Sequence, residues 1–480
     1  MRKLRWVRDD DGLWDLDRST PATLNGIARP VPSDPIPSVL GLSRGIRLSR
    51  PKQVDFFQRF MFMPFVPSYS LHTPHPQSPP GFSLQRVFSL PTFALDRWFG
   101  TVLGQFNLQK LVSGIKKNGF RQPTRQSPWF QSVAEHLSDK SLYAVDLCSE
   151  FYLTPDDSLL LSLESYGYDD YKTPRKKAVF HHKFPCHNLT LEAASPGLFV
   201  DKDGTFYDVP LTMAVDLASV SSSDSGPSYH ICINHNAGPP KKIGSQQNDD
   251  ATVASLQPGL SATTAFSFKN SIDVWRSRAP KLKMVQPYDI FLSNPHISAT
   301  GIIGCVMTAC FGDNSVRAPR GDGSKGFGLG VRRGNCALLA DSFATVSLSA
   351  QHGTFQKMFL DLTRFQAVLD FPSGSTFFSG AASLANDVYN SRAPNLQAIQ
   401  DICPNTTLSL HQQLVGPFSL RVDSGVELDF KKGESERLLK VKDPVFAVEY
   451  ALQVLGSAKA VAWYSPRQQE FMMELRFFET

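Results

Sequence analysis

Apolar and polar residues alternate along most of the chain from Ser141 to the C-terminus. Because successive side chains of a strand point to opposite faces, this period of two predicts β-strands. The clearest run is FSLRVDSGVELDF at 418–430, in which the Phe, Leu and Val side chains share one face. The opposite face carries Arg421, Asp423, Glu427 and Asp429. Soluble sheets use strands of about 5–6 residues, whereas a tilted strand needs about 9–11 residues to cross a bilayer, so this run favours a membrane strand.

Turn sequences between the alternating runs predict antiparallel hairpins. One hairpin is expected around TPDD, between SLYAVDLCSEF and SLLLSLES, and another around SPRQQ near the C-terminus. The final run, FMMELRFFET, is apolar on one face and charged on the other. Since an unpaired strand edge in lipid costs several kcal/mol per backbone group, we expect this last strand to pair with an early one and close a barrel.

Alternation by itself fits a membrane barrel with an apolar outside, but also a lipocalin-like barrel or a sandwich with an apolar inside. Three features favour the membrane barrel: bulky apolar side chains near strand ends, charges of both signs on the polar face, and too many long strands for one small sandwich. We therefore predict an all-β fold, an antiparallel transmembrane β-barrel over residues 141–480. The polar residues of 418–430 are expected to face its lumen, where Arg421 pairs with Asp423 or Glu427 and holds the barrel's shape.

Two stretches interrupt this pattern. Between about 380 and 404 the alternation stops, and AASLANDVYNS and PNLQAIQDIC predict a short helical insert. The apolar stretch from Ile290 to Gly312 is broken at residues 294–296, and the remainder is too short for the ~20 residues of a membrane helix, so an exposed strand is expected. Segments near 229–235 and 343–351 alternate too briefly to be assigned, which leaves the number of strands open.

The first 140 residues differ from the rest. Residues 1–81 form an irregular, Pro-rich N-terminal arm, in which LHTPHPQSPPG predicts an extended linker. Residues 82–140 mix two patterns, because FSLQRVFSL alternates like a strand whereas apolar residues from Leu95 to Phe106 recur at helical spacing. Each segment holds a basic cluster: Arg44, Arg47, Arg50 and Lys52 in the arm, and Lys110, Lys116, Lys117, Arg121 and Arg125 in the mixed segment. Solvated loop charges and lipid-binding residues are equally good interpretations of each cluster.

Composition narrows the classes of function. Charged residues make up 19% of the chain, below the roughly 25% of soluble domains, and aromatic residues reach 11%, which fits a large apolar surface. A net charge of +5 is mild for a dedicated nucleic-acid binder. The seven cysteines form no CxxC pair, and His181, His182 and His187 lack partners at metal-ligand spacing. With no nucleophile-elbow motif either, we expect neither an enzyme nor a bound cofactor or metal.

Stretches spread over nearly the whole chain resemble one known family. They include GLSRGIRLSRPKQV, KSLYAVDLCSEFYLTPDDSLLLS, PGLFVDKDGTFYDVPLTMAVDLAS, SNPHISATGIIGCVMTACFG, FQKMFLDLTRFQAVLDFPSG, QQLVGPFSLRVDSGVELDF and VFAVEYALQVLGSAKAV. On these stretches the sequence resembles the trigalactosyldiacylglycerol 4 family. Members of this family are plant lipid-transfer β-barrels of the chloroplast outer envelope. The linker near 74–80 departs from that family, being proline-rich where a glycine-rich tract is expected.

The resemblance implies a homodimeric barrel that binds phosphatidic acid and moves lipid precursors from the endoplasmic reticulum to the plastid. It places the protein in the chloroplast outer envelope membrane, at contacts with the endoplasmic reticulum. The implied partners are anionic lipid surfaces and a separate inner-envelope lipid transporter driven by ATP, and no nucleic acid.

The headgroup of phosphatidic acid suits the two basic clusters. It is a phosphate monoester whose second pKa lies near 6, so it carries between one and two negative charges. Each Lys or Arg near an anionic surface contributes about 1 kcal/mol, so four or five can hold a headgroup without a deep pocket. The nine basic residues are therefore the candidate lipid-binding residues. The alternative functions are a general solute or protein pore of the same envelope and a soluble β-sandwich scaffold. Whether lipid passes through the lumen or through a lateral opening stays open.

Overall fold

The computed structural model describes most of the chain. The described residues are 5–9, 12–16, 49–70, 81–90, 97–119, 134, 136–166, 174–200, 206–219, 226–242, 258–274, 296–311, 329–333, 336–352, 362–371, 373–392, 396–428, 439–452, 458–466 and 469–477. Among the predicted site residues, Arg44, Arg47, Arg121, Arg125 and Asp429 lie outside these ranges.

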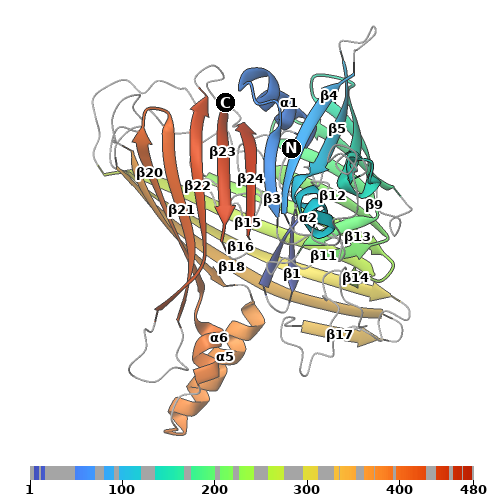
Figure 1. The fold of residues 1–480 in the computed structure, drawn as a ribbon. Coiled ribbons are helices and arrows are strands. Elements are labelled where there is room, and N and C mark those ends of the chain that lie inside the picture. Colours follow the sequence, from blue (N-terminus) through green and yellow to red (C-terminus); the bar gives the residue numbers. More distant parts are fainter. Residues whose placement is uncertain are drawn as a thin grey trace.

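Eighteen strands of the described chain form one closed ring, in which each strand runs antiparallel to the next ring strand along the sequence (Figure 1). They are β3 (Val66–Ser70), β4 (Gly81–Ser89), β5 (Trp98–Asn107), β6 (Tyr143–Tyr152), β7 (Asp157–Tyr166), β8 (Arg175–Lys183), β9 (His187–Ser195), β12 (Leu211–Ser219), β13 (Gly226–Ala237), β15 (Gly259–Asp273), β16 (His296–Phe311), β18 (Cys336–His352), β19 (Thr363–Phe371), β20 (Asn405–Val415), β21 (Phe418–Leu428), β22 (Leu439–Leu452), β23 (Ala458–Ser465) and β24 (Glu470–Phe477). This is the meander that the predicted hairpins require.

The other strands lie beside the ring. β17 (Leu329–Arg333) pairs with one end of β18. β10 (Gly197–Val200), β11 (Phe206–Val209) and β14 (Lys241–Lys242) form a small sheet, and β1 (Arg5–Asp9) pairs with β2 (Gly12–Leu16). The arm predicted to be irregular therefore contains a short hairpin as well as the helix α1 (Arg50–Phe60).

The barrel is apolar outside and polar inside. On β6, Tyr143, Val145 and Leu147 are 41–45% exposed, whereas Asp146 and Glu150 on the opposite face are buried. The same inversion recurs on β7, β12 and β21, where exposed Leu, Met, Val and Phe side chains alternate with buried Ser, Thr, Asp and Arg. A water-soluble barrel buries the apolar face instead, so this arrangement is that of a transmembrane β-barrel.

β21 follows the alternation predicted for 418–430. Arg421 and Asp423 are buried on the inner face, and Phe418 is 45% exposed on the outer face. Glu427 lies on the same strand. The neighbouring strand β22 carries one extra residue where its register with β21 shifts, next to Pro444. Because proline has no amide hydrogen to donate to a ladder, a bulge is the position in a sheet that accepts it.

The structure decides several stretches that the sequence left open. The apolar stretch broken at 294–296 forms β16, as expected for a strand. The segments near 229–235 and 343–351 belong to β13 and β18, which are long strands. The helical spacing between Leu95 and Phe106 falls largely on β5, a strand with apolar residues on both faces: Val102 pairs with Leu147 on the outer face, and Leu103 faces inward. A strand that is apolar on both sides loses its period of two, which explains the ambiguity.

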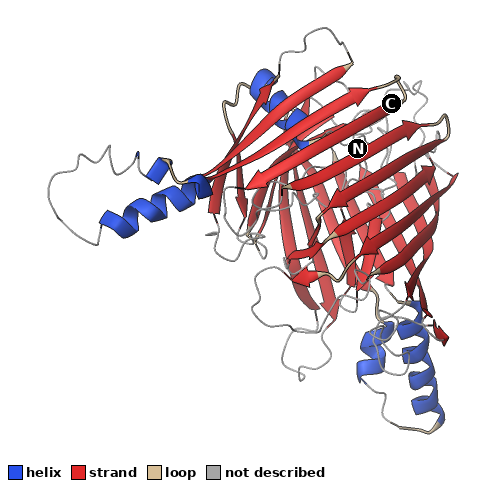
Figure 2. Cartoon of the chain, turned by 90° about the vertical axis from the view of Figure 1, so that its right-hand side faces the viewer, coloured by secondary structure: helices blue, strands red, loops and turns tan. Residues whose placement is uncertain are grey.

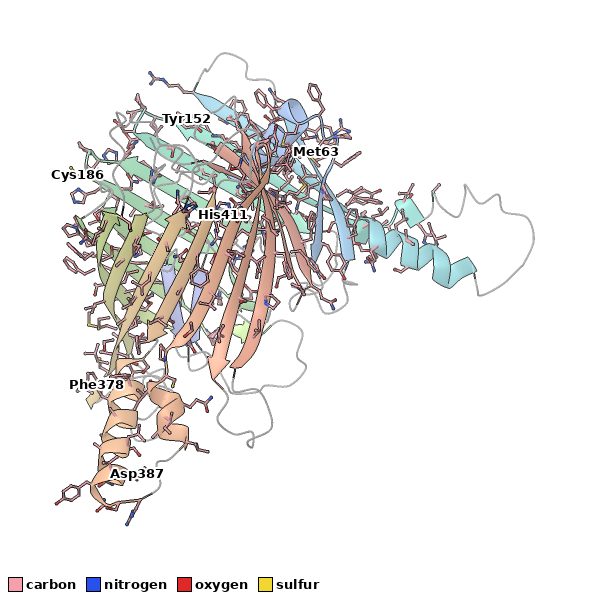
Figure 3. All side chains as sticks on the ribbon, turned by 90° about the vertical axis from the view of Figure 1, so that its left-hand side faces the viewer. Met63, Tyr152, Cys186, Phe378, Asp387 and His411 are labelled. Carbon is pink, nitrogen blue, oxygen red and sulfur yellow. The ribbon has the colours of Figure 1, made fainter. Side chains whose placement is uncertain are left out.

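Helices lie at the margins of the ring. α2 (Leu108–Gly119) follows β5 and projects away from the wall (Figure 2), and the short η2 (Lys140–Leu142) precedes β6. α5 (Gly374–Tyr389) and α6 (Leu396–Ile402) fall in the predicted interruption and form a hairpin. This hairpin extends from the end of the barrel opposite to Met63 and Tyr152 (Figure 3). None of the described helices has the length and apolar character needed to cross a membrane.

The ring closes between its first and last strands, a junction that we call the seam. β24 pairs with β3 in two positions, Glu470 with Ser70 and Phe471 with Tyr69. The closure predicted for the C-terminal strand is therefore confirmed. This ladder is short: on its other side, β24 shares eight paired positions with β23. α1 lies at the end of the seam, between β24 and β4 (Figure 1).

Candidate functional site

α1 places Arg50, one of the predicted basic residues, inside the seam. Its side chain is fully buried. Nε and Nη2 donate to Oε1 of Gln85 on β4 at 3.0 and 2.8 Å, and Nη1 donates to the backbone carbonyl of Met473 on β24. One guanidinium therefore joins strands on both sides of the seam, and charge-assisted hydrogen bonds of this kind are the stronger ones.

Lys52, the second basic residue on α1, forms an ion pair with Glu150 on the inner face of β6. Its Nζ donates to the hydroxyl of Tyr152 and lies 4.5 Å from the centre of that ring. Ser49, which precedes α1, donates its hydroxyl hydrogen to the same carboxylate. Glu150 thus anchors the first turn of α1 to the inner wall.

Gln53 completes the backbone hydrogen bonding of β24 where β3 does not. Its Oε1 accepts a hydrogen bond from the amide of Leu475 at 3.3 Å. Leu475 lies two residues after Met473, whose carbonyl accepts the hydrogen bond from Arg50. Backbone groups of a strand that do not point to one neighbour point to the other side, and β23 already occupies one side of β24. Side chains of α1 therefore take positions on the edge of β24 that β3 leaves unpaired.

One side of α1 packs on the inner face of β4 and β5. Val54 and Phe57 belong to a buried cluster with Val87 and Leu103, which are cross-strand partners. Val87 shares the buried face of β4 with Gln85, and its neighbour Phe88 is 55% exposed on the outer face. These contacts therefore come from inside the barrel.

The other side of α1 packs on the outer face of β22–β24. Leu475 belongs to the same cluster as Val54 and Phe57, and it pairs with Ala460, which pairs with Tyr450. Tyr450 lies on the same strand face as Val448, because it is two residues further along β22, and Val448 is exposed on the outer face. The two edges of the barrel wall therefore overlap at this end of the seam, and α1 fills the space between them.

Exposed aromatic rings gather where α1 runs into β3. They are Phe60, Phe62, Phe65 and Phe88. Arg86, on the outer face of β4, lies over the rings of Phe65 and Phe88, with its guanidinium carbon 5.5 and 5.0 Å from their centres. Aromatic residues with a cation are typical of the membrane–water interface. We call this group the seam mouth.

The second basic cluster begins on α2. Nζ of Lys110 donates to the hydroxyl of Ser141 at 2.6 Å, beside the turn that Asp139 caps. The hydrogen bond from Ser141 holds the pKa of Asp139 below its usual value, against a small opposing effect of burial. Lys116 and Lys117 lie on the same helix, which contains no acidic residue from Leu108 to Gly119. Val112 on this helix is exposed.

Pairs of ionisable side chains line the inner wall away from the seam. Arg421 bonds Asp423 at 3.0–3.1 Å, as the predicted ion pair requires. Three further pairs occupy the inner face: Arg175 with Glu164, His230 with Asp216 and His411 with Glu449. Glu164 and Arg175 are direct cross-strand partners on β7 and β8, and a pair of this kind stabilises the sheet, so it suits a structural role. Within the described ranges, no group of three His, Cys, Asp or Glu side chains is placed to hold a metal ion.

Sequence reasoning missed the part that Gln53, Gln85 and Glu150 play. The signal for α1 was present, because Pro51 suits the first turn of a helix and Val54 and Phe57 are spaced for one face. Nothing in a single sequence connects that helix to Gln85 or to the edge of β24. The helix becomes a site component only because the ring closes on it.

Comparison with known proteins gives one full-length relative. Protein TRIGALACTOSYLDIACYLGLYCEROL 4, chloroplastic, of Arabidopsis thaliana is 53% identical over 488 residues, and the match covers 100% of both chains. No protein-family model matches the chain.

Solved structures of low sequence identity align with most of the chain. OccK10 (OpdN) of Pseudomonas aeruginosa aligns over 86% of this chain and 96% of its own, with 7% identity and a TM-score of 0.33. A porin of Rhodopseudomonas blastica aligns over 86% and 98%, with 9% identity and a TM-score of 0.30.

Proposed function

We propose, from the premise that this chain belongs to the trigalactosyldiacylglycerol 4 family, that it is a non-enzymatic lipid-transfer barrel of the chloroplast outer envelope. It binds phosphatidic acid and moves lipid precursors from the endoplasmic reticulum to the plastid. The name of its relative includes a galactolipid and the chloroplast. The observation that carries the proposal is a basic helix, α2, that projects from the wall of a membrane barrel (Figure 2).

α2 has the composition of a surface that receives anionic lipid. Lys110, Lys116 and Lys117 supply three positive charges, no acid within the helix offsets them, and Val112 offers an exposed apolar side chain. A basic amphipathic helix of this kind binds at the membrane interface through its charges and its apolar face together. Arg121 and Arg125 continue the basic run in the sequence.

The four basic residues of the arm divide into two groups. Arg44 and Arg47 join α2 in the proposed headgroup set. Arg50 and Lys52 have their partners within the wall, so they would have to leave Gln85 and Glu150 before they could bind a headgroup. We assign the resting contact with phosphatidic acid to the other basic residues.

The direction of transport requires a partner that supplies energy. The proposed partner is a separate inner-envelope lipid transporter driven by ATP, and the barrel itself acts as a homodimer at contacts with the endoplasmic reticulum. In this arrangement the barrel conducts lipid across the outer envelope and the partner sets the flux. Co-purification of the two complexes from envelope membranes under mild detergent would test the partnership.

Vesicle flotation tests lipid binding. The full chain in detergent is mixed with phosphatidylcholine vesicles that contain phosphatidic acid or an equal charge of phosphatidylglycerol. We expect retention on phosphatidic acid, reduced at least tenfold in the triple variant Lys110→Gln, Lys116→Gln, Lys117→Gln, because about 1 kcal/mol is lost per charge. A control triple variant, Lys176→Gln, Lys183→Gln, Arg392→Gln, removes the same charge from exposed positions elsewhere and should bind normally.

A general pore of the same envelope is the alternative function. It predicts ion conductance in planar bilayers and equal retention on both kinds of vesicle. Indifference to the headgroup, with α2 neutralised or not, would contradict lipid transfer.

A further inference from the structure

The seam is the weakest junction of the ring in hydrogen-bonding terms. β3 contributes two paired positions to β24, whereas β3 shares five with β4, and β23 shares eight with β24. In a bilayer no water is available to satisfy strand backbone groups, so the edge of β24 beyond Phe471 needs other partners. Arg50 and Gln53 of α1 provide them. The wall is closed at this point by side chains of a helix, which can leave without unpairing a long ladder.

The space that α1 occupies has two chemically different walls. Its apolar residues Val54 and Phe57 share one buried cluster with Leu475 on the outer face of β24, the face that meets hydrocarbon elsewhere on the barrel, and with Val87 on the inner face of β4. Its polar residues contact the interior, through Arg50 with Gln85 and through Lys52 with Glu150. The slot therefore runs from the lipid side of one wall edge to the polar side of the other.

A diacyl phospholipid with an anionic headgroup has the same two chemistries. Its acyl chains fit the outer face of β23 and β24, which Val54 and Phe57 now cover, and its phosphate fits Arg50 and Lys52 once these have left Gln85 and Glu150. Free inorganic phosphate lacks the apolar part and would gain nothing from Leu475 or Ala460. The occupant that matches both walls is a whole lipid molecule.

The seam mouth supplies an entrance at the bilayer surface. Phe60, Phe62 and Phe65 are exposed at the end of α1, and Arg86 stands on the outer face of β4 between Phe65 and Phe88. Aromatic side chains of this kind mark the headgroup level of a membrane. Arg86 is thus a cation on the lipid side of the wall, at the height where a phosphate enters.

We infer that the seam is a lateral portal through which a diacyl phospholipid with an anionic headgroup passes between the bilayer and the barrel interior, with α1 as its gate. The inference rests on the proposed function, because it assumes that the barrel transfers lipid. Arg86 receives the headgroup at the mouth. Arg50 and Gln53 close the gate when no lipid is in transit.

A reversible cross-link that holds α1 against β24 tests the portal. Val54→Cys and Leu475→Cys place thiols on two members of one packed cluster, and a short bis-methanethiosulfonate reagent joins them. The matched control, Leu147→Cys with Leu163→Cys, joins cross-strand partners of β6 and β7 away from the seam, at a ladder that stays paired. Both variants are reconstituted as the full chain, and transfer of fluorescent phosphatidic acid from donor vesicles is measured alongside vesicle binding.

We expect the linked seam variant to lose at least fivefold in transfer rate, to bind vesicles normally, and to recover when dithiothreitol cleaves the linker. The linked control should transfer at the rate of its reduced form. Recovery on reduction also shows that the variant is folded. Equal transfer by the linked and reduced seam variants would overturn the portal and leave the proposed function standing. If the unmodified chain itself transfers no lipid, the proposed function fails and the portal fails with it.

Discussion

Arg50, in the first turn of α1, donates a hydrogen bond to the backbone carbonyl of Met473 in the middle of the last strand. The two residues lie 423 positions apart, and their contact joins the start of the described barrel to its end. The same guanidinium holds Gln85 on β4. The closure of the ring thus depends on one buried side chain as well as on strand pairing.

Replacing Arg50 with alanine should destabilise the barrel. It leaves the carbonyl of Met473 and the amide oxygen of Gln85 without this donor, and each buried polar group left unpaired costs about 1–3 kcal/mol. Urea unfolding in lipid vesicles, followed by tryptophan fluorescence, measures the loss. Arg59→Ala is the control, because that side chain is 59% exposed and its change should stay within about 0.5 kcal/mol. Equal stability of the two variants would contradict the role given to Arg50.

Glu150→Gln should also be destabilising, because it leaves the Lys52 ammonium in the wall without an anion. Removing one partner of a buried ion pair typically costs about 3–5 kcal/mol. The double variant Lys52→Met, Glu150→Gln removes both charges and should recover most of that loss. A double-mutant cycle in urea measures the coupling energy between Lys52 and Glu150. The helix pair Arg59–Asp55 gives the comparison, because an i,i+4 ion pair on a helix surface contributes only about 0.3–0.5 kcal/mol. Additive effects at Lys52 and Glu150 would show that they do not interact.

Binding to phosphatidic acid should strengthen as pH rises from about 5 to 7.5. The second pKa of a phosphate monoester is near 6, so the lipid gains negative charge over this range and is attracted more strongly to the lysines of α2. Phosphatidylglycerol, whose charge is constant over the range, should show no such rise. The same flotation assay at several pH values measures both lipids. A parallel increase for the two lipids would place the effect on the protein and contradict headgroup recognition.

The α5–α6 hairpin should loosen when Asp341 is replaced with alanine. The Asp341 carboxylate accepts from the hydroxyl of Ser373, the N-cap residue of α5, at 2.7 Å and from the amide of Ser375 at 3.2 Å. Loss of an N-cap network costs about 1 kcal/mol locally, so hydrogen exchange in α5 should accelerate roughly fivefold while the ring is unaffected. Tyr389→Ala, at an 88% exposed position on the same helix, should change little. Unchanged exchange in the Asp341 variant would refute the anchoring role.

How far the sequence predicts this fold depends on how sharply each strand separates its two faces. β21 and β6 alternate large apolar residues with charges, so their orientation is legible without a structure. β18 places Ala and Ser on both faces, and its inner face also holds Leu339 and Phe343, so the contrast between the faces is weak although the strand is long. β5 is apolar on both sides because Leu103 meets α1 inside the ring.

The site was less accessible to sequence reasoning than the fold. The positive charge of Arg50 and Lys52 is visible in the sequence, but their partners Gln85 and Glu150 are set by the register of the ring. A cluster of cations in a proline-rich segment suggests a solvated surface. Two of its members instead lie in the wall, because α1 occupies the place where β3 and β24 are no longer paired.

The account depends on which face of the wall meets hydrocarbon, and spin labels on two adjacent residues of β7 measure it most directly. Leu161 is 42% exposed on the outer face, and Ser162 is buried on the inner face. In lipid vesicles, a label at Leu161→Cys should be relaxed strongly by oxygen and weakly by a water-soluble nickel chelate, and a label at Ser162→Cys should not share that preference for oxygen. If the label at Ser162→Cys reports hydrocarbon and the label at Leu161→Cys reports water, the barrel is inverted relative to this account, and a lipid portal at the seam has no basis.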